Sequence, residues 1–230
     1  MKRIPLVMMM VCFIVLQLNA QINNATATKE APNFFIITTD GLRWQELFNG
    51  MQDDIVNQKK FHRGDSNYLF NKYGGATSEA RREKLMPFFW NTIATQGQIY
   101  GNRQKNNKVD VANNQWFSYP GYNEILTGYF DTAIQSNDYP PNPNSNLFAY
   151  LNKQEPYKNK IAAFAAWNAF DRILNEKVSG FPVINSSEPI SSILKDEKSI
   201  LISNMMRDSY QPWRETECLD VYTYYQAMHY

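Results

Sequence analysis

Hydrophobic and polar positions along the chain form short apolar runs and helical stripes, a mixture typical of α/β proteins. The clearest run is Phe34 to Ile37, four apolar residues that predict a strand buried on both faces. After Thr38 to Gly41, the stretch from Leu42 to Phe48 follows a helical pattern that Gly50 ends. The pattern places Asp40 at the carboxyl end of the strand, the edge where ligands bind in open α/β sheets.

The Asp40-Gly41 pair has two interpretations. An Asp-Gly pair often forms the turn of a β-hairpin, and Asp40 would then have a structural role. The residues that follow do not alternate as a returning strand does, which favours a helix instead. A carboxylate at the end of a strand can turn its oxygens toward a hard cation. This stretch alone leaves both interpretations open.

Periodicity predicts four further elements. The apolar stripe from Pro87 to Gly97 predicts a helix, and Ile99 to Asn102 predicts a short strand. Lys160 to Ala166 has the pattern of another buried strand, and Trp213 to Tyr230 that of an amphipathic helix. The stretch from Met51 to Lys84 is charged and interrupted by glycines. We therefore expect it to be a loop-rich excursion over the sheet.

The second informative stretch is Ala112 to Gly128. Pro120 suits the first turn of a helix, and Gly128 suits its end. Ser118 therefore lies just before a helix N-terminus, where free N–H groups and the helix dipole favour an alkoxide and an anionic substrate group. A serine there is more commonly an N-cap. As a nucleophile it needs a base or a metal, and no His or Lys lies close in sequence.

The first twenty residues have the pattern of a signal peptide. Two basic residues precede an apolar run over residues 4–18, which is shorter than the ~20 residues that a membrane span needs. We expect residues 1–20 to be removed on export to the periplasm or the medium, leaving no stable membrane anchor. Residues 21–32 are expected to be a linker, and residues 33–230 one domain.

Composition limits the classes of partner. The chain has 23 Lys and Arg against 22 Asp and Glu, so charge predicts no surface that binds nucleic acid or anionic lipid. After removal of the signal peptide only Cys218 remains, which excludes an internal disulfide. Aromatic residues make up 14% of the chain, which also suits a sugar-binding surface. A small molecule is the expected partner, and a non-enzymatic secreted binding module remains an alternative.

Two motifs together resemble the alkaline phosphatase superfamily, in the branch of type I phosphodiesterase/nucleotide pyrophosphatases and phosphoglyceromutase-like proteins. Members have a strand that ends in Asp-Gly, and later a Thr or Ser followed by an aromatic residue, Pro and Thr-Gly. These motifs read Thr39-Asp40-Gly41 and Ser118-Tyr119-Pro120, with Thr127-Gly128 at the family spacing. The resemblance runs from about Asn33 to the C-terminus. It implies the N-terminal half of an α/β three-layer sandwich with a mostly parallel central sheet.

The resemblance also implies a function, that of a metal-dependent phosphoric-ester hydrolase. In it Asp40 binds a zinc ion, and Ser118, which also contacts the metal, is the nucleophile that takes up the phosphoryl group. Asn137 is implied to hold a phosphate oxygen of the substrate. The implied cofactors are two divalent metal ions, zinc in the family, and the implied partner is a small phosphate ester.

Departures from the family pattern keep alternatives open. Gly121 and Tyr122 differ from the residues common after the Pro in nucleotide pyrophosphatases, which leaves the substrate class open. A phosphoglyceromutase-like phosphotransferase would return the phosphoryl group to an acceptor other than water. A sulfatase-like hydrolase would need an Arg that the motif at Ser118 lacks.

The largest departure concerns metal ligands. The family's later Asp and His motifs are not found after Ser118, where the remaining histidine is His229. We expect His229 to end a helix rather than to bind metal. The sequence therefore predicts an incomplete or inactive fragment of such a domain. A half-domain leaves a sheet edge and an apolar face uncovered, so we expect it to aggregate on expression.

Overall fold

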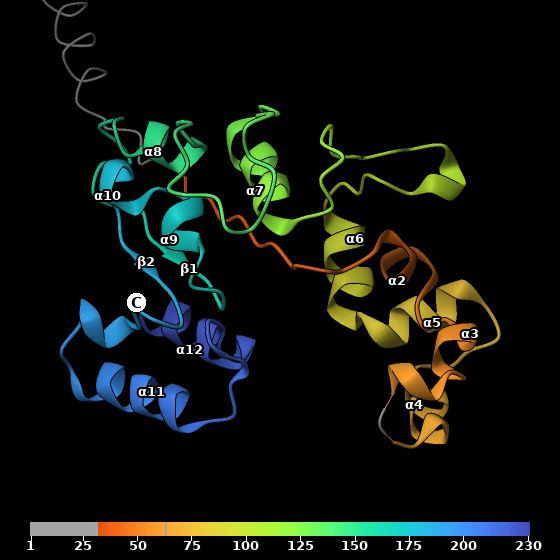
Figure 1. Ribbon diagram of the computed structural model, residues 1–230. Helices are drawn as coiled ribbons and strands as arrows, with labels where there is room; N and C mark the ends of the chain where they lie inside the picture. The colour runs from red at the N-terminus through yellow and green to blue at the C-terminus, as the bar shows by residue number, and fades with distance from the viewer. Residues whose placement is uncertain (1–31, 63) are drawn as a thin grey trace, which may run out of the picture.

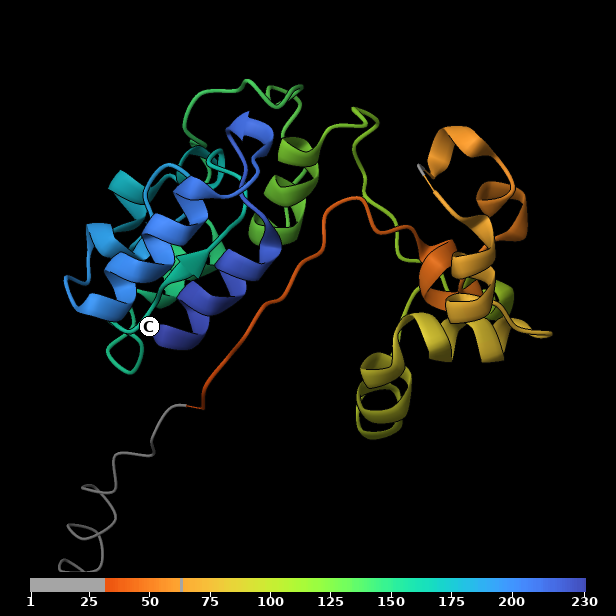
Figure 2. The same ribbon diagram turned by 90° about the horizontal axis from the view of Figure 1, so that it is seen from below.

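The computed structural model describes residues 32–62 and 64–230, so the predicted signal peptide and residues 21–31 of the linker lie outside the described residues. The described chain is mixed α/β and mostly helical, with a short parallel pair of strands (Figure 1). Its helices gather in two groups, one before residue 106 and one after residue 117 (Figure 2). No helix in these ranges is both long and apolar enough to cross a membrane.

The first group consists of short helices. They are α2 (Trp44–Asn49), α3 (Asp53–Val56), η1 (Lys59–Phe61), α4 (Ser66–Tyr73), α5 (Ser78–Leu85), η2 (Phe89–Ile93), α6 (Ala94–Gln96) and η3 (Arg103–Lys105). The helix predicted to end at Gly50 is confirmed by α2. Gly50 has φ 71°, a backbone conformation that favours glycine, and a Cβ there would collide with the backbone of Arg82 on α5. Gly50 therefore allows both the helix end and the close packing of α2 on α5.

Aromatic packing gives the first group a small core of its own. The Phe48 side chain is buried, and its ring meets Trp90 edge-on with 6.0 Å between centroids. Trp90 Nε1 donates a hydrogen bond to the Leu47 carbonyl oxygen at 3.1 Å. The Arg82 guanidinium lies 3.8 Å from the centre of the Trp90 ring. These contacts connect α2, α5 and η2.

The helix predicted from Pro87 to Gly97 is confirmed, and η2 within it is a π-helical turn. The prediction that Met51 to Lys84 is loop-rich is wrong, because α3, α4 and α5 occupy much of it. Side chains that cap helices explain part of this difference. Asp65 accepts from the backbone N–H of the second residue of α4, and Thr77 does the same in α5 at the third residue.

The second group surrounds the strands. It contains α7 (Ser118–Thr127), α8 (Leu147–Leu151), β1 (Ala163–Phe164), α9 (Phe170–Ile173), α10 (Glu176–Ser179), β2 (Val183–Ile184), η4 (Ile190–Ser192), α11 (Glu197–Asp208), β3 (Pro212–Glu215) and α12 (Asp220–His229). Strands β1 and β2 are parallel, with Ala163 opposite Val183 and Phe164 opposite Ile184. The predicted helix ending at Gly128 is confirmed by α7. His229 ends α12, as expected, and its Nε2 lies 2.9 Å from Asp196 Oδ1.

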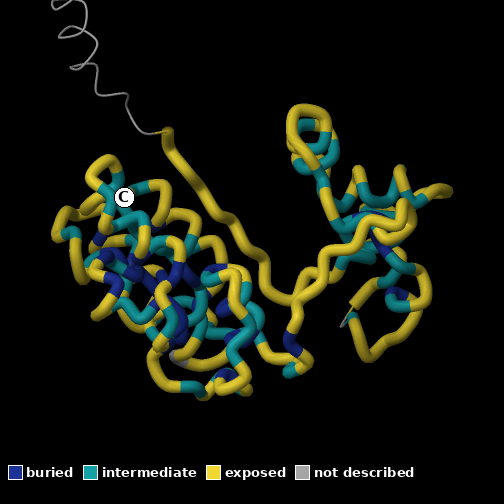
Figure 3. Tube along the Cα trace, turned by 90° about the horizontal axis from the view of Figure 1, so that it is seen from above, coloured by how far each residue is buried: buried dark blue, intermediate teal, exposed yellow. Residues whose placement is uncertain are grey.

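Buried residues gather mainly in the second helical group (Figure 3). The main hydrophobic core lies among α7, α9 and β2. Its buried members are Tyr119, Tyr122, Leu126, Ile134, Ala169, Ile173, Leu174, Phe181 and Val183. Two tyrosines and Leu126 come from one helix, α7, at positions that share a helical face. The core therefore fixes the helix that carries Ser118.

The strand predictions are only partly correct. Lys160 to Ala166 contains β1, which is shorter than predicted, and residues 99–102 form no strand. The helix predicted from Trp213 to Tyr230 is confirmed only from Asp220 onward, as α12. The first residues of the predicted range belong to β3 instead. Short strands depend on pairing with distant segments, which the local pattern does not specify.

The apolar run Phe34 to Ile37 is not a buried strand, which corrects the sequence prediction. Residues 32–42 are exposed and form no regular element (Figure 3), and Phe35 and Ile37 are 82% and 89% exposed. Burial on both faces requires strands on either side and a layer above and below. In the described part of the chain the β1–β2 pair does not extend to this run. The expected three-layer sandwich is therefore not formed by the described residues.

The exposed run predicts self-association of the chain. Replacing Phe35 and Ile37 together by Lys should suppress concentration-dependent light scattering, because it places charge on the apolar surface that copies would share. Val178→Lys is the matched control, since Val178 is 76% exposed but lies in α10. Equal scattering by the double variant and the unchanged chain would contradict this prediction.

Candidate functional site

Helix α7 presents Ser118 in its first turn. Phe117 is the N-cap residue, and its side chain makes no capping hydrogen bond. Ser118 is the first helical residue and is half-buried. Within the described residues its hydroxyl has no hydrogen-bond partner. The alternative in which Ser118 is an ordinary N-cap is therefore wrong, and its hydroxyl is free for another role.

Asn137 lies at the same helix terminus. Its Oδ1 accepts a hydrogen bond from the backbone N–H of Tyr119 at 3.0 Å. Because that N–H can only donate, the amide NH2 of Asn137 faces away from it and keeps its donors. Arg172 Nη2 donates to the Asn137 carbonyl oxygen at 3.3 Å, which holds the loop in place. The structure thus brings Ser118 and Asn137 together, two of the three residues that the sequence singled out.

Tyr119 connects α7 to the loop that carries Asn137. The Tyr119 side chain is fully buried, and its hydroxyl lies 2.8 Å from the Pro140 carbonyl oxygen and 3.0 Å from that of Arg172. Its ring meets Tyr139 edge-on with 5.8 Å between centroids. Burial raises the pKa of Tyr119, so the hydroxyl stays protonated as a donor. The distance between Asn137 and Ser118 is therefore set by the core.

Glu124 holds the chain that leads into α7. Its carboxylate accepts hydrogen bonds from the backbone N–H groups of Ala112 and Asn113 at 2.6 and 2.7 Å, and from Asn113 Nδ2 at 2.6 Å. Burial alone would raise the pKa of Glu124, but these donors favour the charged form and lower it overall. The segment that precedes Ser118 is thus held in place by Glu124, a residue in a later turn of the same helix.

Asp40 lies on the exposed segment 32–42, which precedes α2. Tyr122 is buried in α7. Burial raises the pKa of Tyr122 most, the Thr38 side chain lowers it, and the charges of Asp40 and Asp220 raise it further. The charge of Asp40 thus acts on Tyr122, but no contact among the described residues joins Asp40 to Ser118. The Asp40 side chain itself is exposed.

Two carboxylates that sequence reasoning missed share this region. Burial raises the pKa of Glu217, and the charges of Asp40 and Asp220 raise it further. Glu217 forms an antiparallel bridge with Trp167, and Asp220 begins α12. Both carboxylates lie within the helix predicted from Trp213 to Tyr230, and nothing local relates them to Asp40.

The described residues do not fit a complete zinc centre. Such a centre takes at least three protein ligands from Cys, His, Asp or Glu. No three of these side chains are grouped so that they could hold a metal ion in the described part of the chain. Asp40 and Ser118 offer two oxygens, while His229 contacts Asp196 and His62 contacts the Gly64 carbonyl oxygen.

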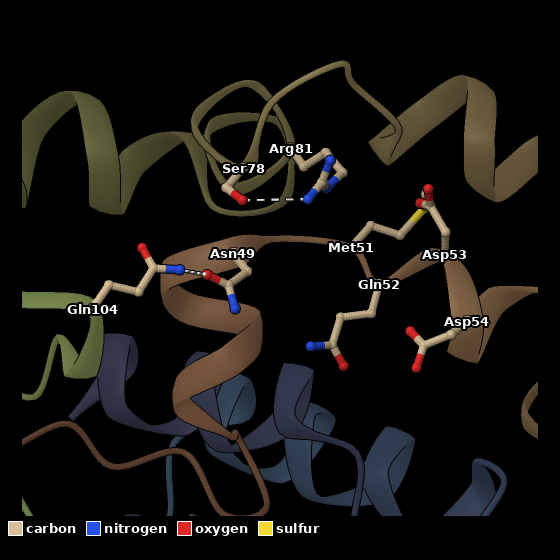
Figure 4. Close-up of a pocket in the computed structure, with 8 residues that line it drawn as sticks. All are labelled: Asn49, Met51, Gln52, Asp53, Asp54, Ser78, Arg81 and Gln104. Atoms are coloured by element: carbon tan, nitrogen blue, oxygen red, sulfur yellow. Dashed lines mark hydrogen bonds between the residues drawn. The ribbon is translucent and has the colours of Figure 1, made fainter.

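A separate hollow of about 430 Å³ lies in the first helical group (Figure 4). It is lined by Asn49, Met51, Gln52, Asp53, Asp54, Ser78, Arg81 and Gln104. Several of these polar groups already bond to each other or to neighbours; Gln104 Nε2, for example, donates to Asn49 Oδ1 at 2.6 Å. Met51 is its one apolar lining residue, whereas small-molecule sites have mostly apolar walls. We therefore assign no role to this hollow.

Comparisons of the chain with protein-family models, with curated proteins and with solved structures gave no significant match.

The two carbonyl contacts of Tyr119 predict a cost for removing its hydroxyl. Tyr119→Phe should lower the free energy of unfolding by about 0.5–1.5 kcal/mol, because two part-buried hydrogen bonds to carbonyl oxygens are lost while the ring still packs. Tyr129→Phe is the control, with a side chain 58% exposed and an expected change near zero. Urea denaturation of both variants measures the difference. Equal stabilities would mean that the hydroxyl does not connect α7 to the Asn137 loop.

Proposed function

We propose that this chain belongs to a metal-dependent phosphoric-ester hydrolase in which Ser118 is the nucleophile. The observation that carries the proposal is the free Ser118 hydroxyl in the first turn of α7, with the Asn137 carboxamide beside it. The two motifs that resemble the alkaline phosphatase superfamily support the same reaction. Export by the N-terminal signal peptide is part of the proposal.

The first turn of α7 suits a phosphoryl group. The dipole of this ten-residue helix gives its N-terminus partial positive charge, which favours an anion. The Ser118 backbone N–H has no helical partner there, and the Asn137 NH2 offers a second donor. Donors fixed before the substrate arrives stabilise charge that develops on phosphoryl oxygens. Their positions depend on Tyr119 rather than on the substrate.

The reaction proceeds in two displacements. Ser118 Oγ bonds to phosphorus as the ester P–O bond breaks, and the alcohol leaves with the proton of the serine hydroxyl. Water then attacks the phosphoserine, which releases inorganic phosphate and restores the hydroxyl. Asn137 Nδ2 donates to a phosphoryl oxygen in both steps. No His or Lys of the described residues contacts Ser118, so the hydroxyl lacks a side-chain base.

The proposed metal dependence rests on the resemblance to the alkaline phosphatase superfamily, which implies that Asp40 is a zinc ligand. A bound zinc ion lowers the pKa of a coordinated hydroxyl. The described residues do not complete such a centre, so this part of the proposal depends on ligands beyond those described. The proposed fold is the three-layer sandwich, which the parallel β1–β2 pair supports.

A second candidate is a non-enzymatic module that binds glycans. Exposed aromatic side chains favour it: Trp116, Tyr210 and Trp213 are 97%, 74% and 67% exposed. Such rings can stack on sugars without any metal. Metal-independent glycan binding together with no release of phosphate would favour this function over hydrolysis.

The test of the proposed hydrolase is Ser118→Ala in the full chain. Hydrolysis of p-nitrophenyl phosphate and its diester should fall at least a hundredfold, roughly the contribution of such a group to catalysis. Ser66→Ala is the matched control, since Ser66 is also a half-buried first residue of a helix, α4. It should leave the rate unchanged.

Zinc content measured by elemental mass spectrometry accompanies this assay. About two zinc ions per chain would support the metal-dependent reaction. Hydrolysis that survives Ser118→Ala would refute the role of Ser118 as nucleophile. An unchanged chain that neither holds zinc nor releases phosphate would refute the proposed function for these residues alone.

A further inference from the structure

Trp116 combines full exposure with a backbone conformation that bulky residues avoid. It is 97% exposed, and its φ is 55°, in the left-handed region. Three of the other four non-glycine residues with positive φ in the described ranges are Asn, which tolerates this region better than Trp does. Both features cost free energy, because the ring stays in water and the backbone is strained. Within the described chain, the Trp116 side chain makes no hydrogen bond or ring contact in return.

The next residue, Phe117, also departs from a local preference. Phe117 is the N-cap residue of α7, a position that favours Ser, Thr, Asp or Asn because their side chains accept from a free backbone N–H. A Phe side chain cannot do so, and Phe117 is 50% exposed. Consecutive departures of this kind, with no gain in packing, are typical of functional sites. Trp116 and Phe117 therefore form an exposed aromatic pair directly before Ser118.

Hydrogen bonds hold the chain on both sides of the aromatic pair. Before the pair, Glu124 accepts from the Asn113 backbone N–H, and Asn113 Oδ1 accepts from the backbone N–H of Gln115 at 3.0 Å. After the pair, Asn137 Oδ1 accepts from the backbone N–H of Tyr119 at 3.0 Å. The pair is thus positioned through its neighbours rather than through its own rings. A surface that is ordered in advance loses little conformational entropy when a ligand binds.

We propose that the aromatic pair binds a flat ring in the leaving group of the ester. The inference rests on the proposed function, in which Ser118 Oγ attacks phosphorus in line with the leaving oxygen. Trp116 lies two residues before Ser118, so their Cα atoms are at most about 7 Å apart. A phosphoryl group at the N-terminus of α7 therefore brings its ester substituent close to the pair. Aromatic faces stack on flat rings, whereas an alkyl chain offers no such face.

Binding of phosphate esters tests the proposal separately from turnover. The full chain carries Ser118→Ala so that no ester is consumed, and calorimetric titration measures the affinity for phenyl phosphate and for n-butyl phosphate. We expect phenyl phosphate to bind at least about fivefold tighter, the lower end of what stacking one base on an aromatic side chain contributes. Glucose 1-phosphate, measured in the same way, distinguishes a sugar ring from an aromatic ring. Inorganic phosphate reports on the phosphoryl position alone.

Trp116→Asn removes the ring and keeps a residue that tolerates positive φ. It should abolish the preference for phenyl phosphate and leave the affinity for inorganic phosphate unchanged, without lowering the thermal midpoint. Trp213→Thr is the matched control, since Trp213 is 67% exposed but lies in β3, where Thr suits a strand. The control should keep the preference. A purely structural role of Trp116 predicts the opposite result, a lower thermal midpoint with the preference unchanged.

The outcomes separate this proposal from the proposed function. Equal affinities for the two esters, binding of neither, or a preference that survives Trp116→Asn would overturn the ring site. The proposed function fails if the unchanged chain releases no phosphate. A preference that depends on Trp116 in such a chain would keep the ring site and reject hydrolysis, whereas hydrolysis without any preference would keep the nucleophile and reject the ring site. A Trp116-dependent preference for glucose 1-phosphate over both other esters would identify the ring as a sugar.

Discussion

The burial of Tyr119 and Tyr122 on one side of α7 determines the geometry of the candidate site. Both rings lie in the main core, so α7 has one fixed rotation about its axis. The Tyr119 hydroxyl then reaches the loop that carries Asn137. A buried side chain with a polar end thus connects this loop to the helix that carries Ser118. A purely apolar pair would give the same burial but no such connections.

Helix ends could be predicted from the sequence because they depend on local chemistry. Gly50 and Gly128 adopt positive φ, and each ends the helix that the pattern predicted before it. Strands could not be predicted equally well, because a strand needs a partner elsewhere in the chain. Phe34 to Ile37 has a strong strand pattern yet lies exposed, and β1 is short. The helices between residues 51 and 84 were missed because their charged composition hid their capping residues.

The candidate site was partly predictable for a similar reason. Ser118 belongs to a motif with a fixed spacing, and Asn137 was suggested only by its approximate distance from that motif. Their juxtaposition depends on a backbone N–H at Tyr119, which no sequence pattern specifies. Glu217 and Asp220 lie far from Asp40 in sequence, yet the charges of Asp40 and Asp220 both raise the pKa of Glu217. Long-range pairing of this kind leaves no periodic signal.

The exposure of the apolar run determines how firmly Asp40 is held. Asp40 follows Ile37 by three residues, so the position of its carboxylate depends on that of the run. A strand paired and covered on both faces would fix Asp40 through many backbone hydrogen bonds. In this structure the run is exposed, so no pairing of this kind fixes Asp40 within the described residues.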